Sequence, residues 1–161
     1  EEGDRLALET EIAAPADGTG HGAHRGGFGA VRNYRLLCSE ASFTVSAGRS
    51  KYPCWGVDGG MKGTPNYAVV YKQGEEPMRV MKVAAMKVRK GDIVSLVTGG
   101  GGGWGDPLER DIDKVEWDAL NGYISLASAR EKYGCVLDPV TYQADREKTR
   151  ELRDQLRKNR N

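Results

Sequence analysis

The residues of this chain that could do chemistry lie mostly in glycine-rich segments. Arg25 stands in the motif Arg25-Gly26-Gly27, where it could clamp a carboxylate or a phosphate. A structural ion pair is the alternative for the same arginine. Asp58 lies in a second glycine-rich segment and would need a partner that shifts its pKa before it could act as a base. Arg25 and Asp58 are therefore the best candidates for a catalytic role, which the sequence alone does not assign.

Five consecutive glycines at residues 99–103 are the most unusual feature of the sequence. Glycine lets a backbone approach a ligand closely, and backbone N–H groups can bind an anion. The candidate contacts to a substrate or phosphate are Arg25, Gly26, Gly27, Gly100, Gly101 and Gly102. The run does not fit a P-loop because no lysine follows it. The alternative is close packing of this backbone against another chain or loop.

Histidines and cysteines give no complete metal site. His21 and His24, the only two histidines, are three residues apart in a glycine-rich segment that gives them no fixed helical face, with Asp17 as the one nearby carboxylate. Cys38, Cys54 and Cys135 are widely separated and form no C-x-x-C pair. We therefore expect no metal bound by this chain alone, and three semi-buried thiols that behave as small hydrophobic groups.

The composition lowers the expectation of a nucleic-acid or membrane partner. Lys and Arg number 24 against 23 Asp and Glu, so the net charge is only +1. The longest apolar runs, such as residues 68–71, are far shorter than the roughly 20 residues that span a bilayer. The first residues do not resemble a secretory signal and look like an interior cut. A cytoplasmic protein with one modest core and an appendage is the expectation.

The first hundred residues predict an antiparallel β structure. Short β-type stretches separated by glycine-rich loops occupy residues 32–37, 42–46, 67–71, 79–83 and 93–97. The loop at residues 52–63 could form a ligand wall, or it could pack Trp55 over the β core. The Lys90-Gly91-Asp92 sequence predicts a turn before the last of these strands.

Helices are expected after Pro107. Asp111 can cap a helix with an apolar face of Ile112, Val115, Trp117 and Leu120, which Gly122 would stop. Ser125 can cap a second helix that runs to Tyr133 and ends at Gly134. The charged segment from Asp145 has too thin an apolar line to fold alone, so we expect it to lie on a partner or fray. The fold class is α+β, with a glycine-rich β domain at 1–110 and a helical extension at 111–161.

The order of these motifs resembles that of one protein family. The motifs are Arg25-Gly26-Gly27-Phe28-Gly29 with Tyr34-Arg35, Pro53-Cys54-Trp55-Gly56-Val57-Asp58-Gly59-Gly60, Gly91-Asp92, residues 99–111, Val115, Asp118, Gly122-Tyr123-Ile124-Ser125, Ala129-Arg130 and Tyr133-Gly134-Cys135-Val136. Across residues 18–138 this compound signature resembles the closing part of hydantoinase B/oxoprolinase proteins. Cys54 and Asp58 depart from the family pattern, and both lie in one loop, which leaves the substrate open.

The resemblance implies a component or C-terminal fragment of an ATP-dependent complex. Its partners would be a hydantoinase A-like subunit, which binds ATP with Mg²⁺, and the remainder of the B-type subunit, where a metal ion is possible. The complex would either carboxylate a ketone, as acetone and acetophenone carboxylases do, or hydrolyse a cyclic amide such as a hydantoin, oxoproline or lactam. The short chain slightly favours the carboxylase branch. The alternative is a noncatalytic assembly module that holds larger subunits together.

Overall fold

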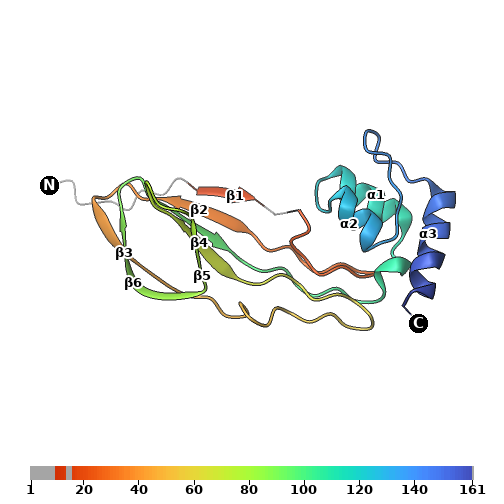
Figure 1. The fold of residues 1–161 in the computed structure, drawn as a ribbon, viewed down its shortest axis with the longest axis horizontal. Helices are drawn as coiled ribbons and strands as arrows, with labels where there is room; N and C mark the ends of the chain where they lie inside the picture. The colour runs from red at the N-terminus through yellow and green to blue at the C-terminus, as the bar shows by residue number, and fades with distance from the viewer. Residues whose placement is uncertain (1–9, 14–15, 161) are drawn as a thin grey trace.

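The computed structural model describes residues 10–13 and 16–160, and it shows β-sheets at one end of the molecule and helices at the other (Figure 1). The five-stranded sheet has the order β1-β2-β7-β4-β5, and a two-stranded sheet pairs β3 with β6. All pairs are antiparallel. The strands are β1 Thr10–Ala13, β2 Val31–Arg35, β3 Glu40–Ser46, β4 Tyr67–Tyr71, β5 Met78–Val80, β6 Lys82–Arg89 and β7 Ile93–Val97. The α+β fold class is thereby confirmed.

The strand predictions hold except in one region. Strands β4 and β7 have the predicted bounds, whereas the predicted strand at residues 79–83 is wrong as a single element. The chain leaves β5 at Val80 and enters β6 at Lys82, so that Met81 joins strands of two different sheets. The strand β1, at the edge of the larger sheet, was not predicted.

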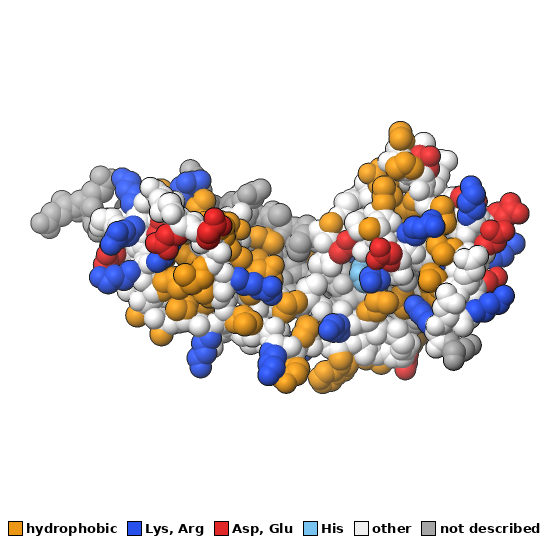
Figure 2. Space-filling model, in the orientation of Figure 1, with side chains coloured by type: hydrophobic (Ala, Val, Ile, Leu, Met, Phe, Trp, Pro, Cys, Tyr) orange, Lys and Arg blue, Asp and Glu red, His pale blue; other side chains and the backbone are white. Residues whose placement is uncertain are grey.

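The β end has its own hydrophobic core. Val70 of β4 lies opposite Val94 of β7, and both are almost fully buried. Leu36, Cys38 and Val88 complete this cluster between the two sheets. An open apolar groove of about 190 Å³ continues from it, and Figure 2 shows hydrophobic side chains gathered over this end of the molecule.

The helical end begins with two capped helices. Asp111 accepts a hydrogen bond from Asp113 N at the start of α1 Ile112–Leu120, and Ser125 accepts one from Ser128 N at the start of α2 Leu126–Glu131. Both predicted caps are confirmed. Helix α2 ends before the predicted Tyr133. The predicted apolar face of α1 is wrong in part, because Trp117 and Leu120 are exposed.

A second hydrophobic core lies among these helices, which corrects the expectation of a single core. Its buried members are Val115, Ala119, Ile124, Ala129, Tyr133 and Cys135. Long segments of the chain run between this cluster and the β core (Figure 1). The proposed division at residues 110 and 111 stays a prediction.

The charged C-terminal segment forms α3 Arg146–Lys158, which packs on its own chain. The expectation that it frays or needs a partner is corrected by its polar contacts. Arg153 donates from Nε to Tyr133 O at 3.0 Å and from Nη2 to Arg110 O at 2.8 Å. Thr149 is fully buried and accepts a hydrogen bond from Val136 N. These side chains dock a helix whose apolar stripe is too thin to do so alone.

No helix among residues 10–13 and 16–160 is long and apolar enough to cross a membrane. Within the same residues the three cysteines are free thiols. Cys54 is half-buried as predicted, whereas Cys38 and Cys135 are fully buried and belong to the two hydrophobic cores.

Candidate functional site

Three glycine-rich segments, residues 18–29, 56–63 and 99–105, lie side by side between the two cores. We call them the glycine layer. Their backbones are joined directly: Gly20 N donates to Gly101 O at 2.8 Å, Met61 N to His21 O at 2.7 Å, and Gly103 N to Met61 O at 2.9 Å. The layer thus connects segments that are distant in the sequence mainly through peptide groups, and the Thr19 hydroxyl adds a side-chain hydrogen bond to Gly101 O.

Glycine is required in this layer because the backbones approach too closely for a Cβ atom. A Cβ at Gly103 would overlap the carbonyl group of His21, and one at Gly60 would overlap the carbonyl group of Gly103. Gly27 is different, since no heavy atom lies within 4 Å of a Cβ built there. Most of the glycines therefore allow close packing of the backbone. Of the two interpretations of the glycine run, a ligand contact or packing against another loop, the structure shows packing against other loops of the same chain.

The amides predicted to bind phosphate are partly used inside the chain. Gly100 N donates to Thr64 Oγ1 at 2.8 Å, and Gly101 N donates to Gly27 O at 2.8 Å. Because these donors already have acceptors, a phosphate would have to compete for them. Phosphate binding by Gly26, Gly27 and Gly100–Gly102 remains a prediction.

Arg25 lies at the edge of the layer and is held in place by the helical end. Its Nε donates to both carboxylate oxygens of Asp118 at 3.1 Å. Its guanidinium carbon lies 4.4 Å from the ring centroid of Phe28 and 5.2 Å from that of Tyr123. The structural ion pair is therefore formed, while the two Nη groups donate to no described residue. A fixed guanidinium with free donors can still bind a second anion.

Arg110 is a second arginine on the same carboxylate. Its Nη2 donates to Asp118 Oδ2 at 2.7 Å and its Nη1 to Ala23 O at 3.0 Å. Arg110 is buried, and its Nε has no partner among the described residues. The Asp118 side chain is only 1% exposed, so it depends on the two arginines for compensation of its charge.

An open cleft of about 440 Å³ lies over this cluster. Its lining is Arg25, Arg110, Asp111, Asp113, Lys114, Trp117 and Asp118. Three cations balance three carboxylates, and among the described residues no cysteine, serine or histidine lines the cleft. The arrangement suits recognition of a polar ligand or a neighbouring surface better than nucleophilic attack.

Sequence reasoning missed Asp118 as the partner of Arg25, and Arg110 as the second arginine on that carboxylate. A signal was present, since Asp118 follows the buried Val115 by three residues and so lies on the same face of α1. A buried aspartate needs a cationic partner. The identity of that partner, 93 residues away, requires the fold.

Asp58 occupies a turn at the surface. Gly60 N donates to Val57 O at 2.9 Å, and the two central residues, Asp58 and Gly59, have φ of 49° and 87°. An Asp-Gly pair is preferred in such a type I′ turn. Asp58 is exposed, so its placement supports a structural role more than a catalytic one.

The neighbouring tryptophan does not cover the β core as one interpretation of the sequence had it. Trp55 is 77% exposed. Trp104 is 50% exposed. Its backbone lies between two neighbouring segments and forms isolated β-bridges with His24 and with Val57. Both tryptophans therefore leave much of their apolar side chain exposed at or beside the glycine layer.

The two histidines have separate surroundings. His21 is buried, and its Nδ1 is hydrogen bonded to Tyr133 Oη at 3.1 Å. His24 is exposed and contacts the ring of Trp104 in a tilted arrangement, with ring centroids 5.4 Å apart. In the described part of the chain, no group of three or more His, Cys, Asp or Glu side chains could hold a metal ion.

Burial controls the protonation of the His21 and Tyr133 pair. It lowers the pKa of His21 below 6.5, with Lys132 adding to the effect and Asp17 opposing it. It raises the pKa of Tyr133 to about 12. Both groups are therefore neutral at physiological pH, which suits a hydrogen bond between the glycine layer and the helical core.

The lowered pKa of His21 predicts a loss of stability in mild acid. The unfolded chain binds a proton near pH 6.5 while the folded chain resists it, so the free energy of unfolding should fall as the pH drops below 6.5. Urea titrations between about pH 7.5 and 5.5 should show this slope in the wild type. The slope should flatten in His21→Gln and persist in His24→Gln; a wild-type slope in His21→Gln would contradict the assignment.

The protein is an α+β protein in which a layer of glycine-rich segments lies between two hydrophobic cores. Two arginines pair with a buried aspartate beside this layer. Residues 7–107 match the hydantoinase B/oxoprolinase family, and the chain belongs to that family. The resemblance that the motifs suggested is thereby confirmed.

Known relatives extend the comparison. The chain is 34% identical over 89% of its length to an uncharacterized protein of Methanocaldococcus jannaschii. It is 35% identical over 92% of its length to a protein of Pseudomonas sp. assigned as the B component of a D-/L-hydantoinase, and 40% identical over 40% of its length to the beta chain of the caprolactamase of Pseudomonas jessenii. It spans 25%, 24% and 11% of these three proteins, respectively.

Two solved structures share the fold. The ATP-dependent caprolactamase of Pseudomonas jessenii aligns with a TM-score of 0.74 at 28% identity, covering 89% of this chain and 25% of that one. A nucleotide-free acetone carboxylase aligns with a TM-score of 0.73 at 21% identity, covering 95% of this chain and 25% of that one. The latter likeness concerns the fold alone.

Proposed function

We propose that this chain is part of a B-type subunit in an ATP-dependent complex that hydrolyses a cyclic amide such as a hydantoin, oxoproline or lactam. The observation that carries the proposal is the 35% identity to the B component of a hydantoinase over nearly the whole chain. The beta chain of caprolactamase, at 40% identity over a shorter stretch, supports the same reaction class.

Carboxylation of a ketone is the second candidate. It is supported by the fold shared with acetone carboxylase, at an identity of 21%. Short length had slightly favoured this branch, but the amide-hydrolysing relatives have the higher identities. Assays of the complex should therefore begin with cyclic amides.

The proposed cofactors and partners follow from the ATP-dependent relatives. ATP with Mg²⁺ would bind a hydantoinase A-like subunit, and a metal ion could bind the remainder of the B-type subunit. A cytoplasmic location suits such a complex. The exposed side chains of Trp55 and Trp104 support contact between the glycine layer and these other parts, because large exposed apolar groups commonly mark interfaces.

Arg25 is our first candidate for a residue near the substrate or a phosphorylated intermediate. Asp118 fixes its Nε, which leaves the Nη groups at the cleft. In the assembled complex, Arg25→Ala should lower ATP-dependent turnover at least about tenfold, equivalent to losing one charge-assisted contact of about 1.4 kcal/mol. Arg25→Lys should recover little, because lysine lacks the planar fork.

The test follows turnover and assembly in the same preparation. Hydrolysis of hydantoins and lactams, and bicarbonate-dependent consumption of ketones, are measured with ATP, while native mass spectrometry reports the subunits present. Arg146→Ala, at an exposed arginine paired with Asp113, is the matched control. If Arg25→Ala assembles and turns over normally, the substrate role is wrong. If assembly itself is lost, the noncatalytic assembly module becomes the better account.

A further inference from the structure

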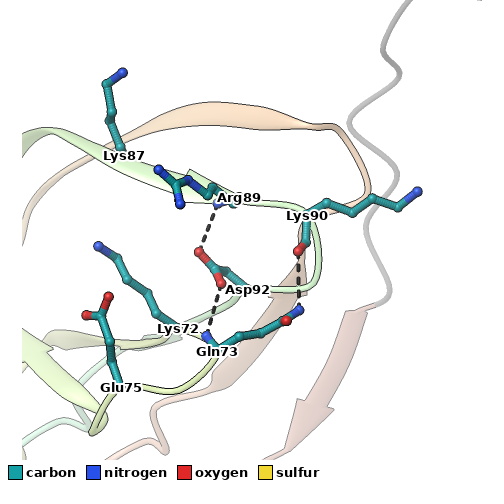
Figure 3. A pocket seen from close by; sticks show the side chains of 7 residues that line it. All are labelled: Lys72, Gln73, Glu75, Lys87, Arg89, Lys90 and Asp92. Carbon is teal, nitrogen blue, oxygen red and sulfur yellow. Dashed lines mark hydrogen bonds between the residues drawn. The ribbon is translucent and has the colours of Figure 1, made fainter.

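A pocket of about 320 Å³ lies between two turns at the β end, remote from the glycine layer. One turn follows β4 and the other joins β6 to β7. The pocket is lined by Lys72, Gln73, Glu75, Lys87, Arg89, Lys90 and Asp92, as Figure 3 shows. Four of these seven side chains are cationic and two are acidic.

The floor of the pocket is fixed by Asp92. This aspartate is 5% exposed and accepts hydrogen bonds from Arg89 N at 2.8 Å and Gln73 N at 3.3 Å. Gln73 Nε2 also donates to Lys90 O at 3.4 Å, across Gly91, whose φ of 91° makes the turn. These hydrogen bonds join the two turns to each other. The backbone that carries the side chains lining the pocket is therefore held in place.

The charge that remains over this floor is positive. The seven lining side chains carry a net charge of +2, and Glu40, which pairs with Lys87 at 3.1 Å, reduces it to +1. The Asp92 carboxylate is included in this count, and it accepts its hydrogen bonds from backbone donors. Neither Lys72 nor Arg89 forms an ion pair with a carboxylate of the described residues. In Figure 3 both side chains extend on the same side of Asp92, with Glu75 nearby, whereas the ammonium group of Lys90 points away.

We propose that this pocket binds a phosphate compound with at least two negative charges. A phosphate group offers three acceptor oxygens and nearly two charges, which suits one guanidinium and one ammonium from different turns. The volume equals on the order of ten water molecules at ~30 Å³ each, so it admits a group larger than a single phosphate. Free pyrophosphate and the phosphate tail of a nucleotide share this chemistry. The inference stands apart from the proposed reaction.

The test is calorimetric binding of pyrophosphate, inorganic phosphate and ADP to the 161-residue chain at low ionic strength. Pyrophosphate should bind the wild type. A double variant, Lys72→Ala with Arg89→Ala, should bind at least tenfold more weakly. Glu75→Gln should bind a few-fold more tightly, since it removes a negative charge at the pocket. Lys62→Ala, at an exposed lysine outside the pocket, should match the wild type. Tighter ADP binding identifies a nucleotide tail as the ligand, and tighter pyrophosphate binding identifies a free phosphate compound.

Several results would overturn the proposal. They are wild-type affinity in the double variant, equal weakening by Lys62→Ala, or binding of an oligoglutamate peptide with none of pyrophosphate. Circular dichroism checks that each variant is folded, and glutamine replaces alanine at Lys72 and Arg89 if the double variant is not. Because the phosphate ligands are assayed without turnover, the outcome is independent of the cyclic-amide assays.

Discussion

Replacing Gly103 with alanine is expected to lower the free energy of unfolding by about 3 kcal/mol, the upper part of the range for overpacking a closed interior. Gly103 is buried where all three segments of the glycine layer meet: its N–H donates to Met61 O, its carbonyl accepts from Val57 N, and its Cα faces His21 O. A methyl group there can be accommodated only if backbones separate, which would break hydrogen bonds. Urea unfolding of the 161-residue chain, followed by circular dichroism, measures the loss.

The matched control for this change lies in the same layer. Gly27→Ala adds the same methyl group where no heavy atom is within 4 Å of it, so the free energy of unfolding should change by less than about 1 kcal/mol. If both variants lose the same stability, glycine is needed for something other than close packing. If Gly27→Ala keeps stability but impairs ATP-dependent turnover, the predicted phosphate contact at Gly27 gains support.

Asp118→Ala is expected to have an effect of similar size, about 3–5 kcal/mol, because it leaves a buried charge without its partner. The carboxylate binds both Arg25 and Arg110, and Arg110 is itself buried. Removing it would leave Arg110 paired only with the carbonyl of Ala23. Thermal and urea unfolding of the 161-residue chain check this expectation.

A second aspartate of the same helix provides the comparison. Asp113 also pairs with an arginine, Arg146, but both side chains are exposed. Asp113→Ala should therefore leave the free energy of unfolding nearly unchanged, as solvent-screened pairs contribute little. Equal losses for Asp113→Ala and Asp118→Ala would show that burial of the charge is not what makes Asp118 important.

Local sequence signals were sufficient for most of the secondary structure. Asp111, Ser125 and Asp145 cap the helices because their side-chain oxygens accept a hydrogen bond from an amide of the first turn. The break at Met81 was missed because residues 79–83 are continuous in β-type character. The chain passes from the five-stranded sheet to the two-stranded sheet at this residue. Which sheet a strand joins depends on its pairing partners, and no local sequence pattern records them.

The candidate site could be predicted only in part. The glycine content indicated close backbone packing, but glycine has no side-chain pattern that tells which segments meet. Arg25 was found from its glycine neighbours, whereas its partner Asp118 comes from a helix far along the chain. The docking of α3 was missed because Thr149 and Arg153 contribute polar contacts that hydrophobic periodicity does not register.

The glycine layer has a thermodynamic consequence for how this protein responds to temperature. Unfolding the layer exposes peptide groups and little hydrocarbon, and polar exposure lowers the heat capacity whereas apolar exposure raises it. The layer therefore contributes little to the heat-capacity increment of unfolding, which comes mainly from the two hydrophobic cores. A smaller increment for the length of the chain gives a flatter stability curve, so the middle of the molecule should be less sensitive to cold than either end.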